Sequence, residues 1–308
     1  MFPGVSSHFP DLRKLEITVG HNVGQFVHAN PVVGELMLIN ATIYTTFRAS
    51  PHMRAMTLSG LTLFPRFSVW SDWAVAALWS LTSLELNFGY PSDPAILRQI
   101  RSWTWDKTFP GPSSMRPLPE RAHIFSQWRL YHLVLSASKE EPAYHAFERM
   151  HEVSFPNLIK LRIKNMVFRH PDPPLPPTAP GALEAFVTRH PNLRTLVLDD
   201  CMLQKDDAGG VYRHWAALCR SLSQALTCLI HLSVHRHDMH AAAGTHDGAG
   251  ALECPCWEFP IGYASAPRGV FERSVFYDPA TALRDMEALL ALEKAIWDRV
   301  EALYSRKT

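Results

Sequence analysis

A short apolar pattern, apolar-x-x-apolar-x-apolar, recurs between residues 12 and 234 and constrains the fold more than any other feature. Its best-formed copy lies in His190–Leu203 and matches the leucine-rich-repeat spacing L-x-x-L-x-L-x-x-N/C-x-L. A unit this short cannot bury its apolar face alone, so copies must stack on one another. The candidate units are Leu12/Leu15/Ile17, Val33/Leu36/Leu38, Met53/Met56/Leu58, Leu81/Leu84/Leu86, Leu130/Leu133/Leu135, Leu158/Leu161/Ile163, Leu193/Leu196/Leu198 and Leu229/Leu232/Val234.

Each unit is predicted to be a short strand. Its last two apolar positions alternate, as in a strand, and a Pro followed by Asn or Asp precedes the units at Phe9–Leu12, Phe155–Leu158 and His190–Leu193. Proline fixes an extended entry and Asn or Asp favours a turn. The alternative is a set of amphipathic helix fragments, because a three-residue spacing also suits a helix. The alternation favours an α/β fold: an irregular leucine-rich-repeat solenoid with a curved parallel sheet on its concave side and helices and loops outside.

The intervals between the units are irregular, about 20 to 50 residues against about 20 to 29 in regular leucine-rich repeats. We expect helices over Ser71–Leu81, Gly181–Arg189 and Tyr212–Ala225 to fill part of them. Proline-rich loops are expected over Phe109–Pro119 and Arg169–Gly181. The solenoid is predicted to occupy residues 1–235.

The pattern ends after Val234. Residues 236–277 are rich in His, Gly and Pro without periodicity, which predicts a partly disordered loop region. Residues 278–308 predict an amphipathic helix, with Asp278 as N-cap and Pro279 in its first turn. Either this helix caps the last repeat or it binds a partner, for example in a coiled coil. Its recurring apolar residues are Leu283, Met286, Leu290, Trp297, Val300 and Tyr304.

Composition excludes several classes of function. The formal net charge is +1 and no long basic run occurs, so neither nucleic acid nor an anionic membrane is expected as partner. Residues 1–14 lack a signal-peptide apolar run, and the longest apolar run, Trp73–Trp79, is too short to span a bilayer. We therefore expect a cytoplasmic or nuclear protein. The odd number of cysteines favours buried thiols over a disulfide framework, and they are Cys201, Cys219, Cys228, Cys254 and Cys256.

A histidine- and cysteine-rich segment has the residue types of a zinc site. Its members are His231, His235, His237, His240, His246, Cys254 and Cys256. Their spacing matches no recognised zinc module, so a polar loop is the main interpretation and a zinc-binding module or metal-dependent enzyme is the alternative. No phosphate-binding loop, nucleophile elbow or His-Glu-x-x-His word occurs. We expect no cofactor and no catalytic activity.

One stretch resembles a known family. The succession of Phe155–Ile163, a proline-rich stretch, Leu183–Phe186 and His190–Cys201 resembles the leucine-rich-repeat region of fungal, mushroom-type F-box proteins. This resemblance implies a substrate-recognition subunit of an SCF-type ubiquitin ligase, in which the repeats hold a protein substrate and an F-box holds a Skp-type adaptor. The Leu-Pro-x-Glu opening of an F-box is not seen ahead of the repeats, and Leu118–Phe125 is too compressed to match. The resemblance therefore covers the repeats and not the F-box.

If the Leu and Ile residues of each strand point into the core, the alternate residues face the concave side. This face changes from acidic to basic along the chain, and Lys160, Arg162 and Lys164 form a cationic row beside Asp199. We expect an acidic segment of a protein to bind there, the alternative being a solvated strand face. The candidate binding residues are Lys160, Arg162, Lys164, Thr195, Val197, Asp199, His231, Ser233 and His235.

Overall fold

The computed structural model describes residues 12–18, 46, 50, 52–61, 80–89, 129–137, 154–169, 179–204, 213–235, 261–265, 272–274 and 279–305. The chain divides into two compact units. The first comprises Met1–Phe147 and Val153–Leu158, and the second comprises Glu148–Glu152 and Ile159–Thr308. Both contain parallel strands, and the described residues of the second include helices, so the chain is an α/β protein.

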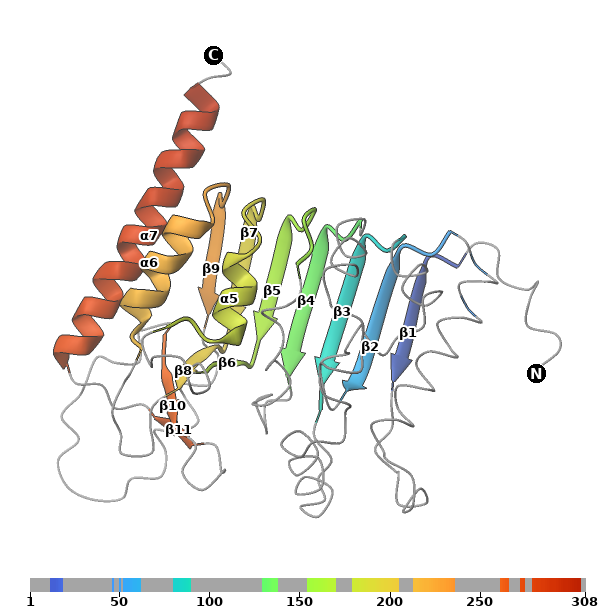
Figure 1. Ribbon diagram of the computed structural model, residues 1–308, viewed down its shortest axis with the longest axis horizontal. Coiled ribbons are helices and arrows are strands. Elements are labelled where there is room, and N and C mark those ends of the chain that lie inside the picture. Colours follow the sequence, from blue (N-terminus) through green and yellow to red (C-terminus); the bar gives the residue numbers. More distant parts are fainter. Residues whose placement is uncertain are drawn as a thin grey trace, which may run out of the picture. The chain divides into compact units, whose positions relative to one another are not determined.

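The first unit contains four parallel strands in chain order (Figure 1). They are β1 (Lys14–Thr18), β2 (Ala55–Leu61), β3 (Ser83–Phe88) and β4 (His132–Ala137). The register aligns the apolar positions of the sequence pattern, since Leu15, Met56, Leu84 and Leu133 occupy one row. Met56, Leu84 and Leu133 are buried. The repeating pattern therefore corresponds to a repeating core.

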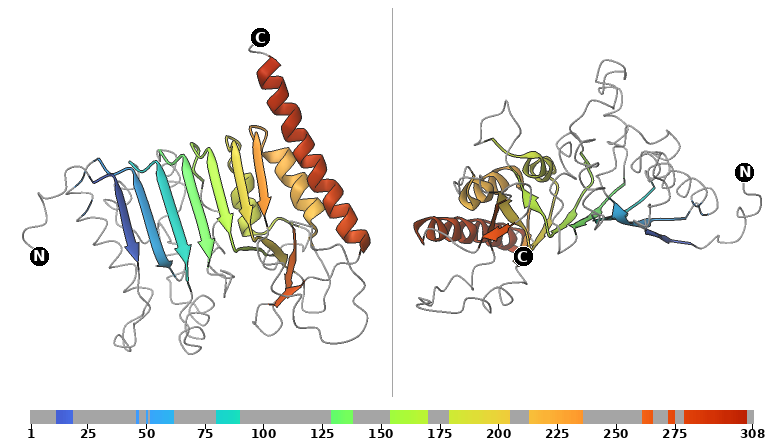
Figure 2. Two further views of the ribbon diagram at one scale, coloured as in Figure 1. Left: turned by 180° about the vertical axis from the view of Figure 1, so that it is seen from behind. Right: turned by 90° about the horizontal axis from the view of Figure 1, so that it is seen from below.

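The second unit contains the strands β5 (Lys160–Lys164), β7 (Thr195–Asp199) and β9 (His231–His235), in which β7 pairs in parallel with both of the others. A second, smaller sheet has the order β11 (Glu272–Ser274), β10 (Tyr263–Ser265), β8 (Met202–Gln204) and β6 (Val167–Phe168). The helices are α5 (Ala182–Thr188), α6 (Trp215–Ala225) and α7 (Pro279–Ser305). Figure 2 shows α5 and α6 along one face of β5, β7 and β9, and α7 beyond α6. None of the helices in the described part of the chain is long and apolar enough to span a membrane.

The same pair of backbone hydrogen bonds begins β2, β3, β4, β7 and β9. The carbonyl of Arg13 accepts from the N–H groups of Arg54 and Ala55, and the carbonyl of Ile159 accepts from those of Arg194 and Thr195. In the same way, the carbonyls of Arg54 and Thr82 in the first unit, and that of Arg194 in the second, each accept from two successive N–H groups at the start of the next strand. In each case the residue just before one strand accepts both of the hydrogen bonds that begin the neighbouring strand. The repeat is thus present in the backbone as well as in the sequence.

Turns precede the strands, as the Pro-Asn words predict. Leu158 N–H donates to the Phe155 carbonyl and Leu193 N–H donates to the His190 carbonyl, each at 3.0 Å. The residue that accepts this bond is buried in both cases, although one is Phe and the other His. The lead-in is therefore a packed part of the repeat.

Asn165 and Asp200 turn the chain out of β5 and β7. Both have left-handed backbone conformations, with φ of 54° and 51°, which Asn and Asp tolerate better than most residues. The Asn165 N–H donates to the Asp199 carbonyl, and the Asp200 N–H donates to the His235 carbonyl, both at 2.8 Å. Each corner is thus fixed to the end of the next strand and sends the chain into β6 or β8.

The strand predictions are confirmed wherever the structure describes the residues, since each of those units overlaps or leads directly into a strand. The unit Val33/Leu36/Leu38, the helix predicted over Ser71–Leu81 and the loop over Phe109–Pro119 lie outside the described residues. The helices predicted over Gly181–Arg189 and Tyr212–Ala225 are confirmed as α5 and α6.

Two predictions need correction. Residues 236–277, predicted to be a loop region, contain the short strands β10 and β11. β10 pairs with β11 and with β8. Each of the two strands is three residues long, which is too short to give a detectable periodicity in the sequence.

The C-terminal helix begins at Pro279, as expected, but buries a different face. Leu289, Leu292 and Ile296 are buried, whereas most of the predicted apolar residues are strongly exposed. The exposed ones are Leu283, Leu290, Trp297 and Tyr304.

Candidate binding face on strands β5, β7 and β9

The candidate residues form a regular grid on one face of the second unit's parallel sheet. Register places Lys160, Thr195 and His231 in one row, Arg162, Val197 and Ser233 in the next, and Lys164, Asp199 and His235 in the third. The intervening Leu161, Ile163, Leu196 and Leu198 are buried on the opposite face. All nine predicted residues are therefore brought together, because a two-residue side-chain period aligns alternate positions across parallel strands.

Asp199 is held within the protein and is not exposed on this face. Its side chain is only 1% exposed, and its Oδ2 accepts from Nε of Arg162 at 2.6 Å and pairs with Nη2 at 2.6 Å. The Arg162 side chain is 48% exposed and covers this carboxylate. The expectation that Asp199 contacts a partner is thus corrected: its charge is already matched, and the exposed half of Arg162 remains on the surface.

The two lysines beside Arg162 differ from it. Lys160 is exposed and Lys164 is half-buried, and neither pairs with an acidic side chain among the described residues. They lie about 13 Å apart along β5, at roughly 3.3 Å per residue. The face therefore carries two separated positive charges on either side of a neutralised Arg–Asp pair.

The β7 and β9 side of the grid is polar and partly exposed. Thr195 and Val197 are half-buried, and His231 and His235 are exposed. The Ser233 hydroxyl lies 2.5 Å from Nε2 of His235, so these two side chains are held together along β9. Hydroxyl, imidazole and ammonium groups can donate hydrogen bonds to carboxylates or main-chain carbonyls.

The first unit has its own polar face, which is hydrogen-bonded across strands. Asn87 Nδ2 donates to the Ser59 hydroxyl at 3.0 Å, and the Ser136 hydroxyl donates to Asn87 Oδ1. Thr57 Oγ1 donates to Glu85 Oε2 at 3.4 Å. These side chains bond to one another, so part of the hydrogen-bonding capacity of this face is already used within the sheet.

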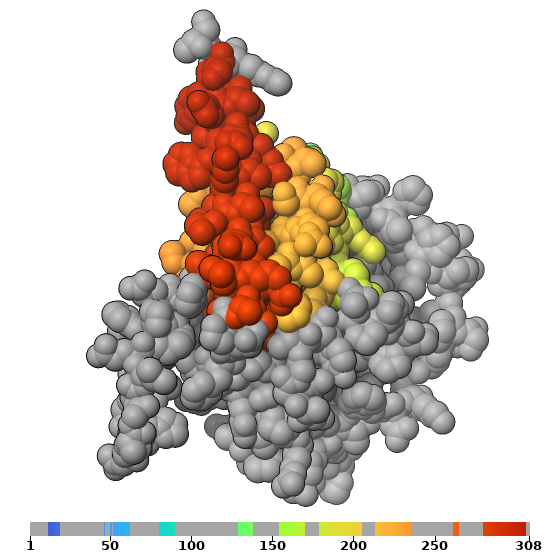
Figure 3. All heavy atoms as spheres, turned by 90° about the vertical axis from the view of Figure 1, so that its left-hand side faces the viewer, coloured from blue at the N-terminus to red at the C-terminus, as the bar shows by residue number. Residues whose placement is uncertain are grey.

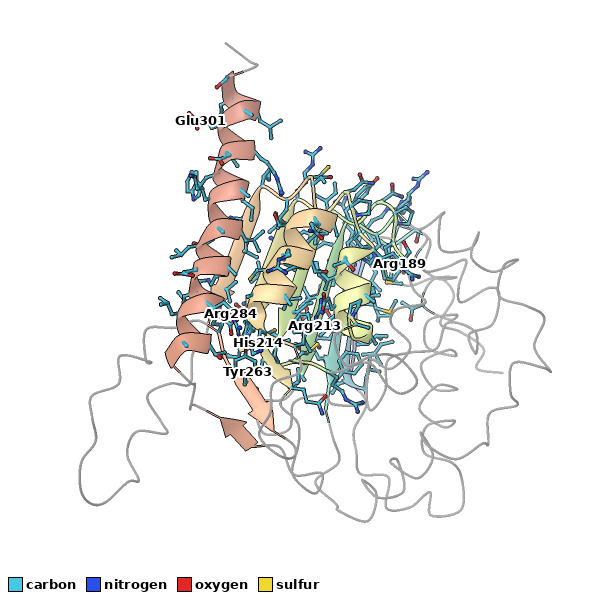
Figure 4. All side chains as sticks on the ribbon, turned by 60° about the vertical axis from the view of Figure 1, so that its left-hand side comes forward. Arg189, Arg213, His214, Tyr263, Arg284 and Glu301 are labelled. Atoms are coloured by element: carbon cyan, nitrogen blue, oxygen red, sulfur yellow. The ribbon has the colours of Figure 1, made fainter. Side chains whose placement is uncertain are left out.

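A buried polar cluster at the start of α6 was not predicted. Asp285 of α7 is fully buried; its Oδ1 accepts from the Ala216 N–H at 2.9 Å and its Oδ2 accepts from the Tyr263 hydroxyl at 2.5 Å. Trp215 Nε1 donates to the Gly262 carbonyl at 2.8 Å. Figure 4 shows Tyr263 close to this end of α6. The carboxylate thus takes the place of an N-cap side chain, since α6 has none of its own.

The same cluster sets the electrostatics of neighbouring groups. Burial lowers the pKa of His214, the residue before α6, and the positive charge of Arg284 lowers it further while Asp285 acts in the opposite sense. His214 and Arg284 lie together in Figure 4. His214 is therefore favoured in its neutral form. The cluster joins α6, α7 and β10 by hydrogen bonds.

The two buried thiols, Cys201 and Cys219, are not activated. Burial raises the pKa of Cys201 far above its ordinary value and raises that of Cys219 to about 12, so both stay protonated near neutral pH. Cys228 is exposed, which corrects the expectation that the thiols are buried. Cys254 and Cys256 lie outside the described residues.

The proposed zinc ligands fall mostly outside the described part of the chain. Only His231 and His235 are within it, at opposite ends of β9, and the described residues bring no three His, Cys, Asp or Glu side chains together as a metal-binding group. The metal hypothesis for residues 237–256 is thus not addressed by the described structure.

Known proteins provide no further guide. The chain matches no family model, no curated protein and no solved structure.

Proposed function

We propose that this chain is a non-catalytic, leucine-rich-repeat protein-recognition module, an irregular solenoid whose partner binds across the grid on β5, β7 and β9. The observation that carries the proposal is the placement of Lys160 and Lys164 on either side of Arg162. Asp199 matches the charge of Arg162, whereas the two lysines pair with no acidic side chain among the described residues. An acidic segment of another protein would supply their counter-charges.

The repeated backbone supports the solenoid part of this proposal. Aligned buried leucines, shared carbonyl acceptors and matching lead-in turns recur from strand to strand. In repeat proteins the core residues of each unit are occupied by packing, so recognition falls to the alternate strand positions. The grid consists of such positions.

The polar character of the grid favours an extended or loop segment with carboxylates. Three adjacent strands span about 10 Å, at roughly 4.8 Å between neighbours, which is the width of a single peptide segment. Charge complementarity of this kind increases the association rate and fixes orientation more than it raises affinity. We therefore expect binding that weakens as salt concentration rises.

The test uses the Lys160→Glu/Lys164→Glu variant in a pull-down from extracts of cells that produce the chain naturally. Arg162 is left in place because its removal would expose a buried carboxylate without its partner and confuse loss of folding with loss of binding. Lys14→Glu is the matched control, since Lys14 is an exposed first residue of β1 just as Lys160 is of β5. Partners retained by wild type and control but lost by the double variant support the proposal; identical recovery by all three rejects it.

The resemblance to fungal F-box proteins supports a finer proposal, that the bound protein is a ubiquitination substrate. A Skp-type adaptor that co-purifies stoichiometrically with the chain would support membership of a ligase complex. If partners depend on Lys160 and Lys164 but no adaptor is recovered, the recognition face stands and the ligase role is rejected.

A further inference from the structure

The outward face of α7 carries a regular apolar stripe that the protein's own core does not use. Leu283, Leu290, Trp297 and Tyr304 are 61%, 57%, 72% and 70% exposed. They follow one another at seven-residue intervals, so they drift only about 20° per step around the helix. A seven-residue apolar repeat is the spacing of a coiled-coil seam.

This stripe is separate from the face that anchors the helix. At about 100° per residue, Leu289, Leu292 and Ile296 lie roughly 90° to 150° around α7 from the stripe, where they are buried and where the helix packs on α6. Figure 3 shows the C-terminal end of α7 extending past the end of α6. A second helix can therefore approach the stripe without displacing the packing of α7 on α6.

Charged residues within the stripe identify the second helix. Glu287, Lys294 and Glu301 are exposed, are themselves seven residues apart, and occupy the positions between the apolar residues. If two copies of α7 met in parallel and in register, these residues would lie on opposite sides of the seam and would not meet one another. In an antiparallel pair, Glu287 of each copy lies level with Lys294 of the other, and the two-fold axis makes this contact twice.

We propose that α7 mediates self-association, forming an antiparallel coiled-coil contact with α7 of a second copy of this chain. In this register the two-fold axis passes between residues 290 and 291, so the two Leu290 side chains lie close together, and Leu283 of each copy lies near Trp297 of the other to complete the apolar seam. The contact is isologous, because the same residues serve both copies. It is independent of the recognition face proposed above.

The oligomeric state of the purified full chain tests this contact directly. Sedimentation equilibrium over a concentration series of about two orders of magnitude should give a dimer that dissociates on dilution. Leu290→Glu/Trp297→Glu should give a monomer, and unchanged circular dichroism and thermal unfolding would show that the fold is intact, since both side chains are exposed. Arg220→Glu, an exposed change on α6, is the control and should leave the dimer unchanged.

Charge exchange tests the register. Glu287→Lys and Lys294→Glu should each weaken the dimer by about tenfold, because each puts like charges together twice. The combined Glu287→Lys/Lys294→Glu variant should restore wild-type dissociation. Mixing the two single variants should form a heterodimer in preference to either homodimer.

Three outcomes would overturn the proposal. They are a wild-type chain that stays monomeric throughout the concentration series, a dimer that persists after Leu290→Glu/Trp297→Glu, and a combined charge exchange that fails to restore what the single changes weakened. If the chain stays monomeric and α7 binds a different protein, the proposal of self-association is likewise overturned.

Discussion

Asp285 and Arg299, about four turns apart on α7, contact opposite ends of α6. The Asp285 carboxylate accepts from the Ala216 N–H at the first turn of α6. The Arg299 guanidinium donates to the carbonyls of Ser223, Leu226 and Leu229 at and beyond its last turn. A negative group at the helix N-terminus and a positive group at its C-terminus both oppose the helix dipole. A single helix thus caps its neighbour at both ends.

Replacing Asp285 should destabilise the second unit. Asp285→Ala leaves the Ala216 N–H and the Tyr263 hydroxyl without their acceptor, and we expect the free energy of unfolding to fall by about 2–4 kcal/mol. Asp285→Asn keeps one acceptor oxygen and should cost less. Urea denaturation followed by circular dichroism measures both. Asp298→Ala, an exposed change on the same helix, should stay within about 0.5 kcal/mol of wild type, and an equal loss there would contradict this role of Asp285.

The Arg162–Asp199 pair should show strong energetic coupling. Removing the guanidinium leaves a carboxylate that is 1% exposed without its partner, so Arg162→Met should cost about 1–3 kcal/mol, reduced by the partial exposure of Arg162. In an Asp199→Asn background the same change should cost much less. A double-mutant cycle of unfolding free energies gives the coupling, and additive effects would show that the pair is energetically unimportant.

Stability should fall at acidic pH because of His190. Burial lowers the pKa of His190 to about 4, although its Nδ1 lies 2.7 Å from the Phe186 carbonyl. Between this pKa and the ordinary value of 6.5, the unfolded chain binds a proton that the folded chain does not. Stability from this group is therefore complete above about pH 6.5 and decreases as pH falls toward 4, by roughly tenfold in the unfolding equilibrium constant per pH unit.

His190→Phe is the matching variant, because Phe155 fills the equivalent lead-in position one repeat earlier. The variant should lose most of the pH dependence between 4 and 6.5 while remaining folded. Urea midpoints at a series of pH values measure the effect. An unchanged slope in the variant would assign the pH dependence to other groups.

The corner residues should accept glycine better than a branched side chain. Asn165 and Asp200 have positive φ, which costs a β-branched residue about 1–2 kcal/mol more than glycine. Asn165→Val should therefore lower the thermal midpoint more than Asn165→Gly, and the same order should hold at Asp200. Equal midpoints for the Val and Gly variants would mean that the corners relax to another conformation.

The repeat was predictable from sequence because its signal is local. Leu161, Ile163, Leu196 and Leu198 have the spacing of buried positions in strands, and they are buried. The positions of the grid residues were predictable for the same reason, because side chains alternate between the two faces of a strand. The burial of Asp199 did not, because it depends on Arg162 in a strand 37 residues away along the chain.

The buried face of α7 was not predictable from periodicity alone. The helix has two apolar stripes, and the one with the larger residues, including Trp297 and Tyr304, is the exposed one. The stripe that packs on α6 has Asp285 before its apolar residues Leu289, Leu292 and Ile296 and Arg299 after them, and these charged ends make it look polar in the sequence. Asp285 and Arg299 favour burial of this face because they bond to the two ends of α6. That contact depends on the tertiary structure and cannot be read from the sequence of α7.

The shared carbonyl acceptors have a consequence for how such a chain can change over evolution. Paired residues are 28 positions apart between β2 and β3 and 49 apart between β3 and β4, yet both strands begin with the same pair of hydrogen bonds. Because the start of each strand is fixed by its neighbour, the intervening chain can lengthen or shorten without shifting the register. Insertions in these intervals can accumulate while the strands of each unit keep their alignment.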